Sequence, residues 1–247
     1  MFDPPIALAS LSGVADADWA EGGASFAGCA FLGGIALDDA TRRAAREMVQ
    51  RDREEFLPPN PRNFIYEQFR ALENVPIRAG INVRSAALAP IEDAADLCRE
   101  YDAVLEINAH CRQAEMCRAG AGESLLGDPE TLCRQVEAAT ATGASVSVKV
   151  RTEVPGVDLP ALAARLERAG ADAIHVDAMD SEAVVADVVA ACDCFVIANN
   201  GVRDAESVRE YFEYGADAVS VGRASVDPDV LARVRTATRD WSREATL

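Results

Sequence analysis

The sequence predicts a single (β/α)8 barrel that spans residues 1–247. Eight short apolar runs, many rich in β-branched residues, alternate with stretches that have the periodicity of amphipathic helices. The chain has the usual length of such a barrel, and 49% apolar residues are enough to build its core. An open, doubly wound sheet is the alternative, and no Gly-x-Gly-x-x-Gly follows the first run to support it.

The strands of a (β/α)8 barrel all end at the same rim, so the loops that follow them are expected to build the functional site. The expected strands lie at 6–11, 25–31, 76–81, 103–107, 145–150, 172–176, 194–198 and 217–221. Two connecting segments are longer than the others. Residues 53–75 read as an irregular loop after the second helix, and residues 108–127 as an extended loop after the fourth strand.

The expected helices carry residues that favour helix ends. Asp128 and Pro129 supply a cap residue and a first-turn proline, and Gly143, Gly170 and Gly215 fit the position that follows a helix. The clearest helical stretches are 38–56, 90–101, 128–143, 204–215 and a closing helix at 227–243.

The composition is strongly acidic, with a formal net charge of −17 and a pI near 4.5. One interpretation is a protein that repels nucleic acid. The other, which the scarcity of lysine favours, is adaptation to a salt-rich cytoplasm in which charge repulsion is screened. Seven cysteines, an odd number, indicate free thiols in a reducing cytosol. The chain shows no signal-peptide pattern and no run long enough to span a membrane, so we expect a cytoplasmic protein without a membrane partner.

Lys149 is the only lysine among 24 basic residues, and it lies at the end of the run Ser-Val-Ser-Val-Lys-Val-Arg. A lysine at a strand end could simply reach solvent. Ionisable residues at the C-terminal ends of barrel strands are, however, typical of active sites. A guanidinium is broad and forked, so arginine cannot replace a compact ammonium in a tight site.

Four stretches at expected strand ends carry a resemblance. They read LASLSGVAD (8–16), LEINAHCRQAEMCRAGAGESLLGDP (105–129), VKVR (148–151), and VIANNGVRD (196–204) together with GADAVSVGRAS (215–225). Together they resemble the flavin-dependent tRNA-dihydrouridine synthases, in a short archaeal-type form related to dihydroorotate dehydrogenase barrels. The resemblance covers most of residues 6–226 and is strongest from residue 102 onward.

The resemblance implies that the chain binds FMN, with NADPH or NADH as the electron donor. Independently of any family, the glycine-bearing loops after the last two strands offer backbone N–H groups suited to a phosphate. Lys149 matches the family lysine that contacts the flavin ring, and its cation suits the pyrimidine edge where negative charge gathers on reduction. The implied cofactor-binding residues are Ala9, Ser10, Leu11, Lys149, His175, Asn199, Asn200, Gly201, Gly222 and Arg223.

The same resemblance implies catalytic and substrate residues. Asn108 and Cys111 match the family pattern Asn-x-Gly-Cys-Pro, in which the cysteine protonates the uracil ring. His110 and Arg112 replace the glycine and proline of that pattern, so either Cys111 or His110 is expected to act as the acid. Arg151 lies on the same strand face as Lys149 and is expected to contact substrate or to form an ion pair at the rim.

Two positions depart from the family pattern. His175 lies two residues before the position of the family histidine, which Asp177 occupies, so His175 either reaches the cofactor from a lower layer or is a core histidine. On the third strand, Gly80 stands at the position of the family glutamine, with Asn82 or Arg78 as substitutes on the same face. His110, Cys111 and Cys117 lack the usual spacing of a zinc site, so no metal is expected.

The resemblance therefore implies an FMN-dependent oxidoreductase that reduces uridine to dihydrouridine in tRNA. The helical tRNA-binding domain of the synthases is absent from the expected elements, which keeps a small pyrimidine open as the substrate of a dihydroorotate dehydrogenase-type enzyme. A barrel that binds a phosphate or nucleotide without redox activity is the third possibility. The sequence does not specify an oligomeric state.

Overall fold

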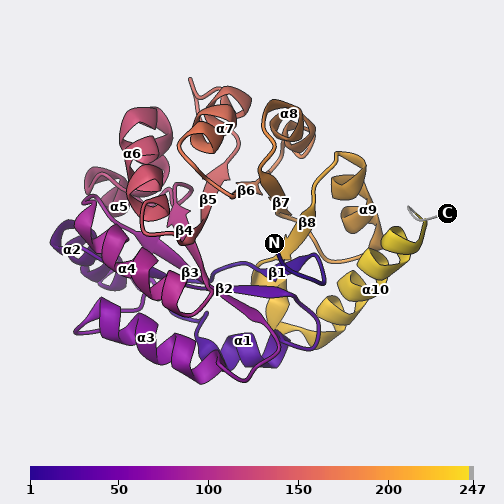
Figure 1. The fold of residues 1–247 in the computed structure, drawn as a ribbon, viewed down its shortest axis with the longest axis horizontal. Coiled ribbons are helices and arrows are strands. Elements are labelled where there is room, and N and C mark those ends of the chain that lie inside the picture. Colours follow the sequence, from indigo (N-terminus) through magenta and orange to yellow (C-terminus); the bar gives the residue numbers. More distant parts are fainter. Residues whose placement is uncertain (245–247) are drawn as a thin grey trace.

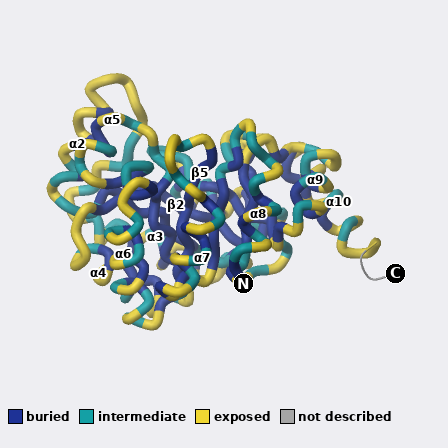
Figure 2. Tube along the Cα trace, turned by 90° about the horizontal axis from the view of Figure 1, so that it is seen from above, coloured by how far each residue is buried: buried dark blue, intermediate teal, exposed yellow. Residues whose placement is uncertain are grey.

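The computed structural model describes residues 1–244 and forms a closed barrel of eight parallel strands (Figure 1). The strands follow one another round the barrel in chain order, and β1 closes the barrel by pairing with β8. Buried strands occupy the middle of the molecule and more exposed helices surround them (Figure 2). The predicted (β/α)8 barrel is confirmed.

All eight predicted strands are present, and only the second is displaced by several residues. The strands are β1 (Ile6–Leu8), β2 (Cys29–Ala36), β3 (Arg78–Arg84), β4 (Val104–Asn108), β5 (Ser145–Arg151), β6 (Ala173–Asp177), β7 (Phe195–Asn199) and β8 (Ala218–Val221). β2 was expected at 25–31 and instead continues to Ala36, through Gly33 and Gly34. They lie inside the strand, where a Cβ on Gly34 would lie 2.6 Å from Asn82 Oδ1, closer than packing allows.

The helices that cover the barrel include the predicted ones. The α-helices are α1 (Ala17–Gly23), α2 (Asp39–Val49), α3 (Pro61–Leu72), α4 (Ala89–Glu100), α5 (Ala114–Arg118), α6 (Pro129–Thr140), α7 (Leu159–Arg168), α8 (Val184–Ala191), α9 (Ala205–Glu213) and α10 (Pro228–Glu244). Two short 3-10 helices are η1 (Gly122–Gly127) and η2 (Arg223–Val226).

The prediction of an irregular segment at 53–75 is wrong for its second half, which forms α3. Asn60 begins this helix by accepting a hydrogen bond from Asn63 N at 3.0 Å, and Pro61 fits its first turn. The prolines of this segment suggested a loop, but one of them is a helix-start signal. The preceding helix also ends at Val49, earlier than the predicted 56.

The predicted helix ends are confirmed where the structure tests them. Asp128 Oδ1 accepts a hydrogen bond from Thr131 N at 3.1 Å. Gly143, Gly170 and Gly215 have φ values of 86°, 102° and 89°, a region that favours glycine.

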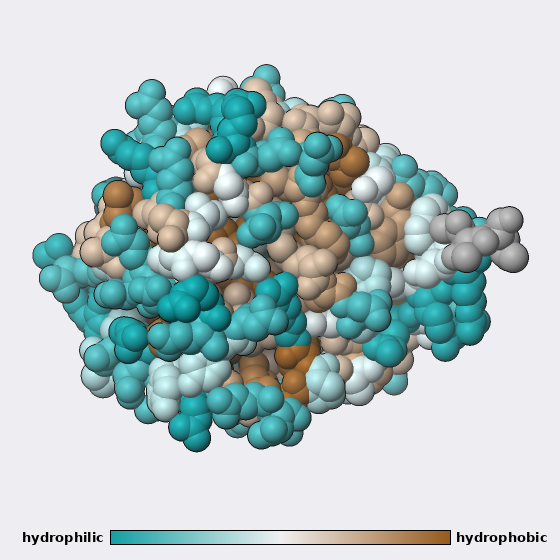
Figure 3. Space-filling view, viewed as in Figure 1, coloured by the Kyte–Doolittle hydropathy of each residue, from teal (hydrophilic) through white to brown (hydrophobic). Residues whose placement is uncertain are grey.

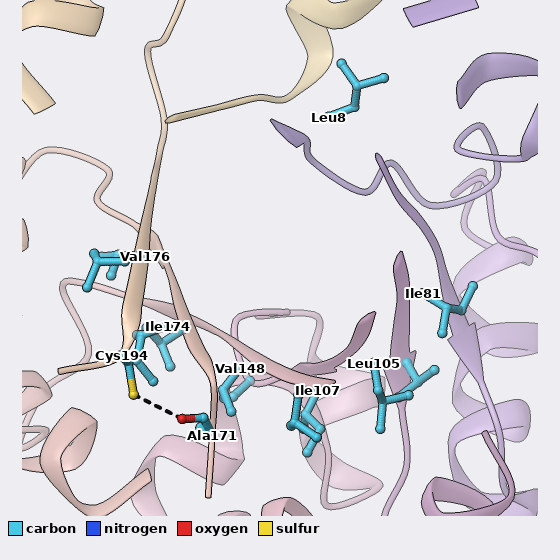
Figure 4. Packing of buried hydrophobic residues seen from close by; sticks show 14 of the residues in the cluster. Leu8, Ile81, Leu105, Ile107, Val148, Ala171, Ile174, Val176 and Cys194 are labelled. Carbon is cyan, nitrogen blue, oxygen red and sulfur yellow. Dashed lines mark hydrogen bonds between the residues drawn. The ribbon is translucent and has the colours of Figure 1, made fainter. Parts of the chain in front are cut away.

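Each strand directs alternate side chains toward the helices and toward the barrel axis. Figure 4 shows part of the outward set, in which Ile81, Leu105, Ile107 and Val148 belong to the cluster packed between strands and helices. The inward set near the N-terminal end of the strands is a separate apolar layer. Its members are Ala7, Cys29, Phe31, Val104, Ala173, Ile197 and Ala218.

The inward positions above this apolar layer are polar. Asn82, Glu106, Ser147, His175 and Ser220 are all completely buried. Because the layer beneath them is apolar and closed, these polar groups have access only to one another and to the C-terminal rim.

Hydrophilic residues cover much of the molecular surface, with apolar residues nearer the middle of the face shown in Figure 3. Within the described residues, no helix is both long enough and apolar enough to cross a membrane. All seven cysteines are free thiols, and four of them are buried.

The excess of 41 acidic over 24 basic residues predicts a salt-dependent stability. We expect the melting temperature to rise by several degrees between about 0.1 M and about 2 M KCl, because salt screens repulsion between exposed carboxylates. Differential scanning calorimetry measures this shift, with sucrose in place of salt as the control for nonspecific solvent effects. A melting temperature that stays constant or falls with KCl would contradict the salt-adapted interpretation.

Candidate active site

The C-terminal rim of the barrel gathers polar side chains from four adjacent strands. β4 ends at Asn108, β6 at Asp177 and β7 at Asn199, and Lys149 lies near the end of β5. The strand register pairs Asn108 with Lys149, and Asp177 with Asn199. The structure thus brings three of the predicted residues, Asn108, Lys149 and Asn199, to one rim.

Lys149 is a buried cation without a hydrogen-bond partner. The residue is 2% exposed, and within residues 1–244 no acceptor lies in hydrogen-bond or ion-pair distance of its ammonium. Burial lowers the pKa of Lys149, and the negative charges of Glu106 and Asp177 partly oppose that effect. An unpaired buried cation is costly, and a perturbed ionisable group at a barrel rim is typical of a site that awaits a ligand acceptor.

The side-chain oxygen of Asn108, at the end of β4, binds the backbone of the loop that follows. Asn108 Oδ1 accepts hydrogen bonds from Cys111 N at 3.0 Å and from His110 N at 3.3 Å. His110 Nδ1 lies 3.1 Å from the same oxygen. Asn108, predicted to contact substrate, therefore holds the backbone that carries Cys111.

His110 is half-buried, and its position bears on which residue could be an acid. Burial lowers its pKa well below the ordinary value, and the positive charges of Lys149, His175, Arg84 and Arg151 act in the same direction. His110 is therefore neutral near pH 7 and lacks the extra proton of an acid. Of the two acids that the sequence left open, the structure favours Cys111, whose side chain is partly accessible.

Arg151 forms the ion pair at the rim that was one of its two expected roles. Its Nη1 lies 2.5 Å from Glu123 Oε2 in η1, and its Nη2 lies 3.0 Å from Met179 Sδ. Arg151 Nε is buried and has no partner among the described residues. This pair connects β5 to the long loop after β4, so the guanidinium is largely committed to protein contacts.

The loops predicted to bind phosphate include a turn with positive φ values and border open space. Asn200 and Gly201 have φ values of 102° and 67° in the turn after β7, and both are exposed. A Cβ built on Gly201 or on Gly222 would meet no atom within 4 Å, so space adjoins both glycines. Arg223 is exposed at the start of η2 and has no hydrogen-bond or ion-pair partner among the described residues.

The predicted residues of the first strand lie at its C-terminal end. Ala9 is 2% exposed and its N–H donates to Val221 O at 2.9 Å, which aligns this segment with β8. Ser10 and Leu11 are half-buried in the following loop. Leu11 O accepts hydrogen bonds from Val14 N and Ala15 N at 3.0 and 2.8 Å, so the loop turns back at this point.

Of the two alternatives expected for His175, the structure shows the core histidine whose ring nitrogens both have hydrogen-bond partners. His175 lies in the layer below Lys149. Its Nδ1 lies 2.6 Å from Glu106 Oε2, and its Nε2 lies 2.7 Å from Ser220 Oγ. Both ring nitrogens are therefore occupied by protein groups. As the ring lies, it presents no free nitrogen to a cofactor at the rim.

Glu106 is the main residue of the site that sequence reasoning missed. It is completely buried and contacts His175, Asn82 and Ser147. Burial raises the pKa of Glu106, but the His175 ring, the Lys149 charge and the Asn82 amide outweigh burial and lower it overall. One signal was available in the sequence, because Glu106 is an acid inside an apolar strand, two residues before Asn108 and therefore on the same face.

Two cavities lie at opposite ends of the barrel. The larger, about 700 Å³, lies at the end away from this rim and is lined in part by Phe2, Arg78 and Tyr101. Arg78, a suggested cofactor contact, is therefore at the wrong end of the barrel, where it pairs with Asp102 at 2.9 Å. The second cavity, of about 380 Å³, lies beside Arg151. In residues 1–244, no group of three or more His, Cys, Asp and Glu residues is arranged to hold a metal ion.

The lowered pKa values of His110 and His175 predict acid sensitivity. Burial is the first cause of both shifts. The unfolded chain therefore binds more protons, and each histidine stabilises the fold fully above its unfolded pKa near 6.5. As pH falls from there toward the folded values, we expect unfolding free energy to decrease by up to about 1.4 kcal/mol per pH unit for each histidine.

Urea denaturation between pH 8 and pH 5 tests this expectation. The variant His110→Asn cannot titrate at that position, so its stability should fall less steeply with pH than that of the wild type. The carboxylates titrate equally in both proteins and cancel in the comparison. Equal slopes would show that the folded protein does not suppress protonation of His110.

A closed (β/α)8 barrel whose polar side chains converge on the C-terminal rim defines the protein as a barrel of the enzymatic type. Residues 80–246, more than half of the chain, match the model of the family described as "Dihydrouridine synthase (Dus)". The chain therefore belongs to the dihydrouridine synthase family. Membership of this family supports a flavin-dependent oxidoreductase as the general class.

Other comparisons agree with this fold. An uncharacterized protein of Methanocaldococcus jannaschii is 26% identical over 242 residues, which cover 93% of this chain and 92% of that protein. Among solved structures, FabK of Thermotoga maritima has a TM-score of 0.57 and 17% identity, and its M276A mutant has 0.58 and 16%. The matches cover 91% of this chain but only 60% and 62% of the FabK chains, so they bear on the barrel alone.

Proposed function

We propose that the protein is an FMN-dependent reductase that converts uridine to dihydrouridine in tRNA, with NADPH or NADH as the electron donor. The observation that carries the proposal is the unpaired Lys149 ammonium at the rim of a dihydrouridine synthase-family barrel, beside the loop that holds Cys111. A flavin offers the acceptor that this cation lacks. The reducing cytosol remains the predicted location.

The residues at the rim fit FMN. Lys149 supplies an unpaired donor for the pyrimidine edge of the flavin, where negative charge collects on reduction. Gly201 and Gly222 border open space, and Arg223 is an unpaired exposed cation on the same side of the barrel. These three residues suit a phosphate, which backbone N–H groups and arginine bind well.

The proposed reaction adds one hydride and one proton across the C5–C6 double bond of uracil. Bound FMN would supply the hydride chemistry at this rim, with NADPH or NADH as the source of the electron pair. The Cys111 thiol supplies the proton to the neighbouring carbon and is left as a thiolate, which solvent reprotonates. The neutral His110 and the Asn108 amide hold the cysteine loop against the rim.

A small pyrimidine is the second candidate substrate, and the net charge of −17 favours it at low salt because a polyanion such as RNA is repelled. The screening of that repulsion in a salt-rich cytoplasm would restore RNA as a substrate. The two candidates therefore differ in the salt dependence of their turnover.

The first test is the visible absorption spectrum of the purified protein in molar KCl, before and after addition of FMN. Flavin bands that bleach under anaerobic NADPH or NADH support the redox function. The reduced protein is then mixed with unmodified tRNA transcript, with free uracil and with orotate. Dihydrouridine in the transcript supports the proposal, and turnover of a free pyrimidine alone replaces it with the second candidate. A folded protein that binds no flavin would overturn both and leave a phosphate-binding barrel.

A further inference from the structure

Two amide side chains on the adjacent strands β3 and β4 connect Glu106 to the loop that carries Cys111. Asn82 Nδ2 donates to Glu106 Oε1 at 2.7 Å. Asn82 Oδ1 then accepts from Asn108 Nδ2 at 2.8 Å, and Asn108 Oδ1 accepts from Cys111 N at 3.0 Å. We name these four residues, Glu106, Asn82, Asn108 and Cys111, the amide relay.

Every link of the amide relay has a direction, because an amide has a donor end and an acceptor end. An ionised carboxylate is acceptor-only, so Glu106 forces Asn82 to turn its NH2 group toward it. Asn82 must then present its oxygen to Asn108, which turns the NH2 group of Asn108 inward. The oxygen of Asn108 is left facing outward, where it receives the N–H of Cys111.

The surroundings of Asn82 oppose the reversed orientation. Glu106, Asn82 and Asn108 are at most 4% exposed, so no bulk water is present to satisfy a reversed amide. The opposite oxygen of Glu106 is held at 2.6 Å by His175 Nδ1, which fixes the carboxylate in turn.

We propose that Glu106 and Asn82 are positioning residues that set, through the direction of the amide relay, the conformation of the loop carrying Cys111. They act through Asn108 and do not touch the reacting atoms. That the positioned cysteine is a proton donor rests on the proposed function, whereas the positioning itself does not.

The test is amide hydrogen exchange resolved to single residues by NMR, which needs neither flavin nor RNA. The variant Asn82→Leu cuts both links while it leaves the Glu106, His175 and Lys149 side chains in place. We expect the Cys111 amide to exchange at least tenfold faster in this variant. Amides of β7 and β8 should keep their wild-type rates, which a general loss of stability would not allow.

Two further variants make the test specific to direction. Glu106→Gln keeps the side-chain shape but offers a donor as well as an acceptor, so the orientation of Asn82 is no longer fixed, and Cys111 exchange should be intermediate. Ser147→Ala is the matched control, because Ser147 Oγ contacts the other side of Glu106 at 3.4 Å and lies outside the amide relay. Its Cys111 amide should exchange at the wild-type rate.

A wild-type exchange rate of the Cys111 amide in Asn82→Leu would overturn the proposal. A wild-type rate in Glu106→Gln would overturn the part of the proposal that concerns the direction of the amides. If Asn82→Leu does not fold, Glu106→Gln decides alone. If wild-type protein binds flavin, Asn82→Leu should also lower the rate of pyrimidine reduction about tenfold while flavin reduction by the nicotinamide is unchanged. Faster exchange in a protein that binds no flavin would support the amide relay and reject only the proposed function.

Discussion

Lys149→Ala is expected to lose flavin binding, with the dissociation constant of FMN rising by about two orders of magnitude. A charge-assisted contact in a desolvated site contributes about 1.5–3 kcal/mol, and a tenfold change in affinity corresponds to about 1.4 kcal/mol. Lys149 as a residue is 2% exposed, and its ammonium lacks a hydrogen-bond or ion-pair partner among residues 1–244, so its contact with a ligand is not shared with the protein. Quenching of flavin fluorescence in molar KCl measures the affinity.

Two controls accompany this variant. Lys149→Arg keeps the charge but places a wider, forked group in the same space, so we expect it to restore little of the affinity. Arg151→Met removes a cation two residues along the same strand face, where it is bound to Glu123. Arg151→Met should therefore weaken FMN binding much less than Lys149→Ala. Equal effects of the two removals would mean that general positive charge, and not the Lys149 contact, holds the flavin.

Cys111→Ser is expected to lower the rate of uridine reduction by about 10²–10⁴-fold, the usual contribution of a positioned proton donor. Reduction of the bound flavin by the nicotinamide should proceed at the wild-type rate, because that half-reaction needs no proton from Cys111. Stopped-flow absorbance separates the two half-reactions. The serine keeps the size of the side chain, so loss of the thiol is the main change.

Cys117→Ser is the matched control for the cysteine variant. Cys117 is also partly accessible and lies in α5, within the same connection after β4, where its thiol contacts Cys111 O at 3.5 Å. It should retain most of the activity. If Cys117→Ser were inactive and Cys111→Ser active, the proton donor would have to be assigned anew.

The rim of the site was predictable from sequence because its residues obey a local rule. Lys149, Asn108 and Asn199 lie at or near the ends of apolar runs, and the ends of parallel strands share one rim whatever the exact register. The turn after β7 was predictable for a similar reason, since Asn200-Gly201 after a strand is a local turn signal.

The interior of the site was not predictable, because it depends on which positions of different strands face each other. Asn82 meets Glu106 only through the register of β3 on β4. His175 is in register with Lys149 on β5, and it contacts Glu106 on β4 across that intervening strand. The pair of Arg84 and Glu55, at 2.6 Å and buried on both sides, likewise joins a strand end to an irregular segment. No pattern along the chain relates those two positions.

The single lysine has a consequence for how the protein can be studied. Lys149 carries the only ε-amine in the chain, so the N-terminal amine is the only other target for an amine-selective reagent. The lowered pKa makes the neutral, nucleophilic form of Lys149 more abundant than that of an exposed lysine. The same residue is also the only cleavage point for a lysine-specific protease, so a modified amine at this position leaves the chain uncut. The extent of amine modification at Lys149 thus measures, without any introduced label, whether a ligand occupies the C-terminal rim of the barrel.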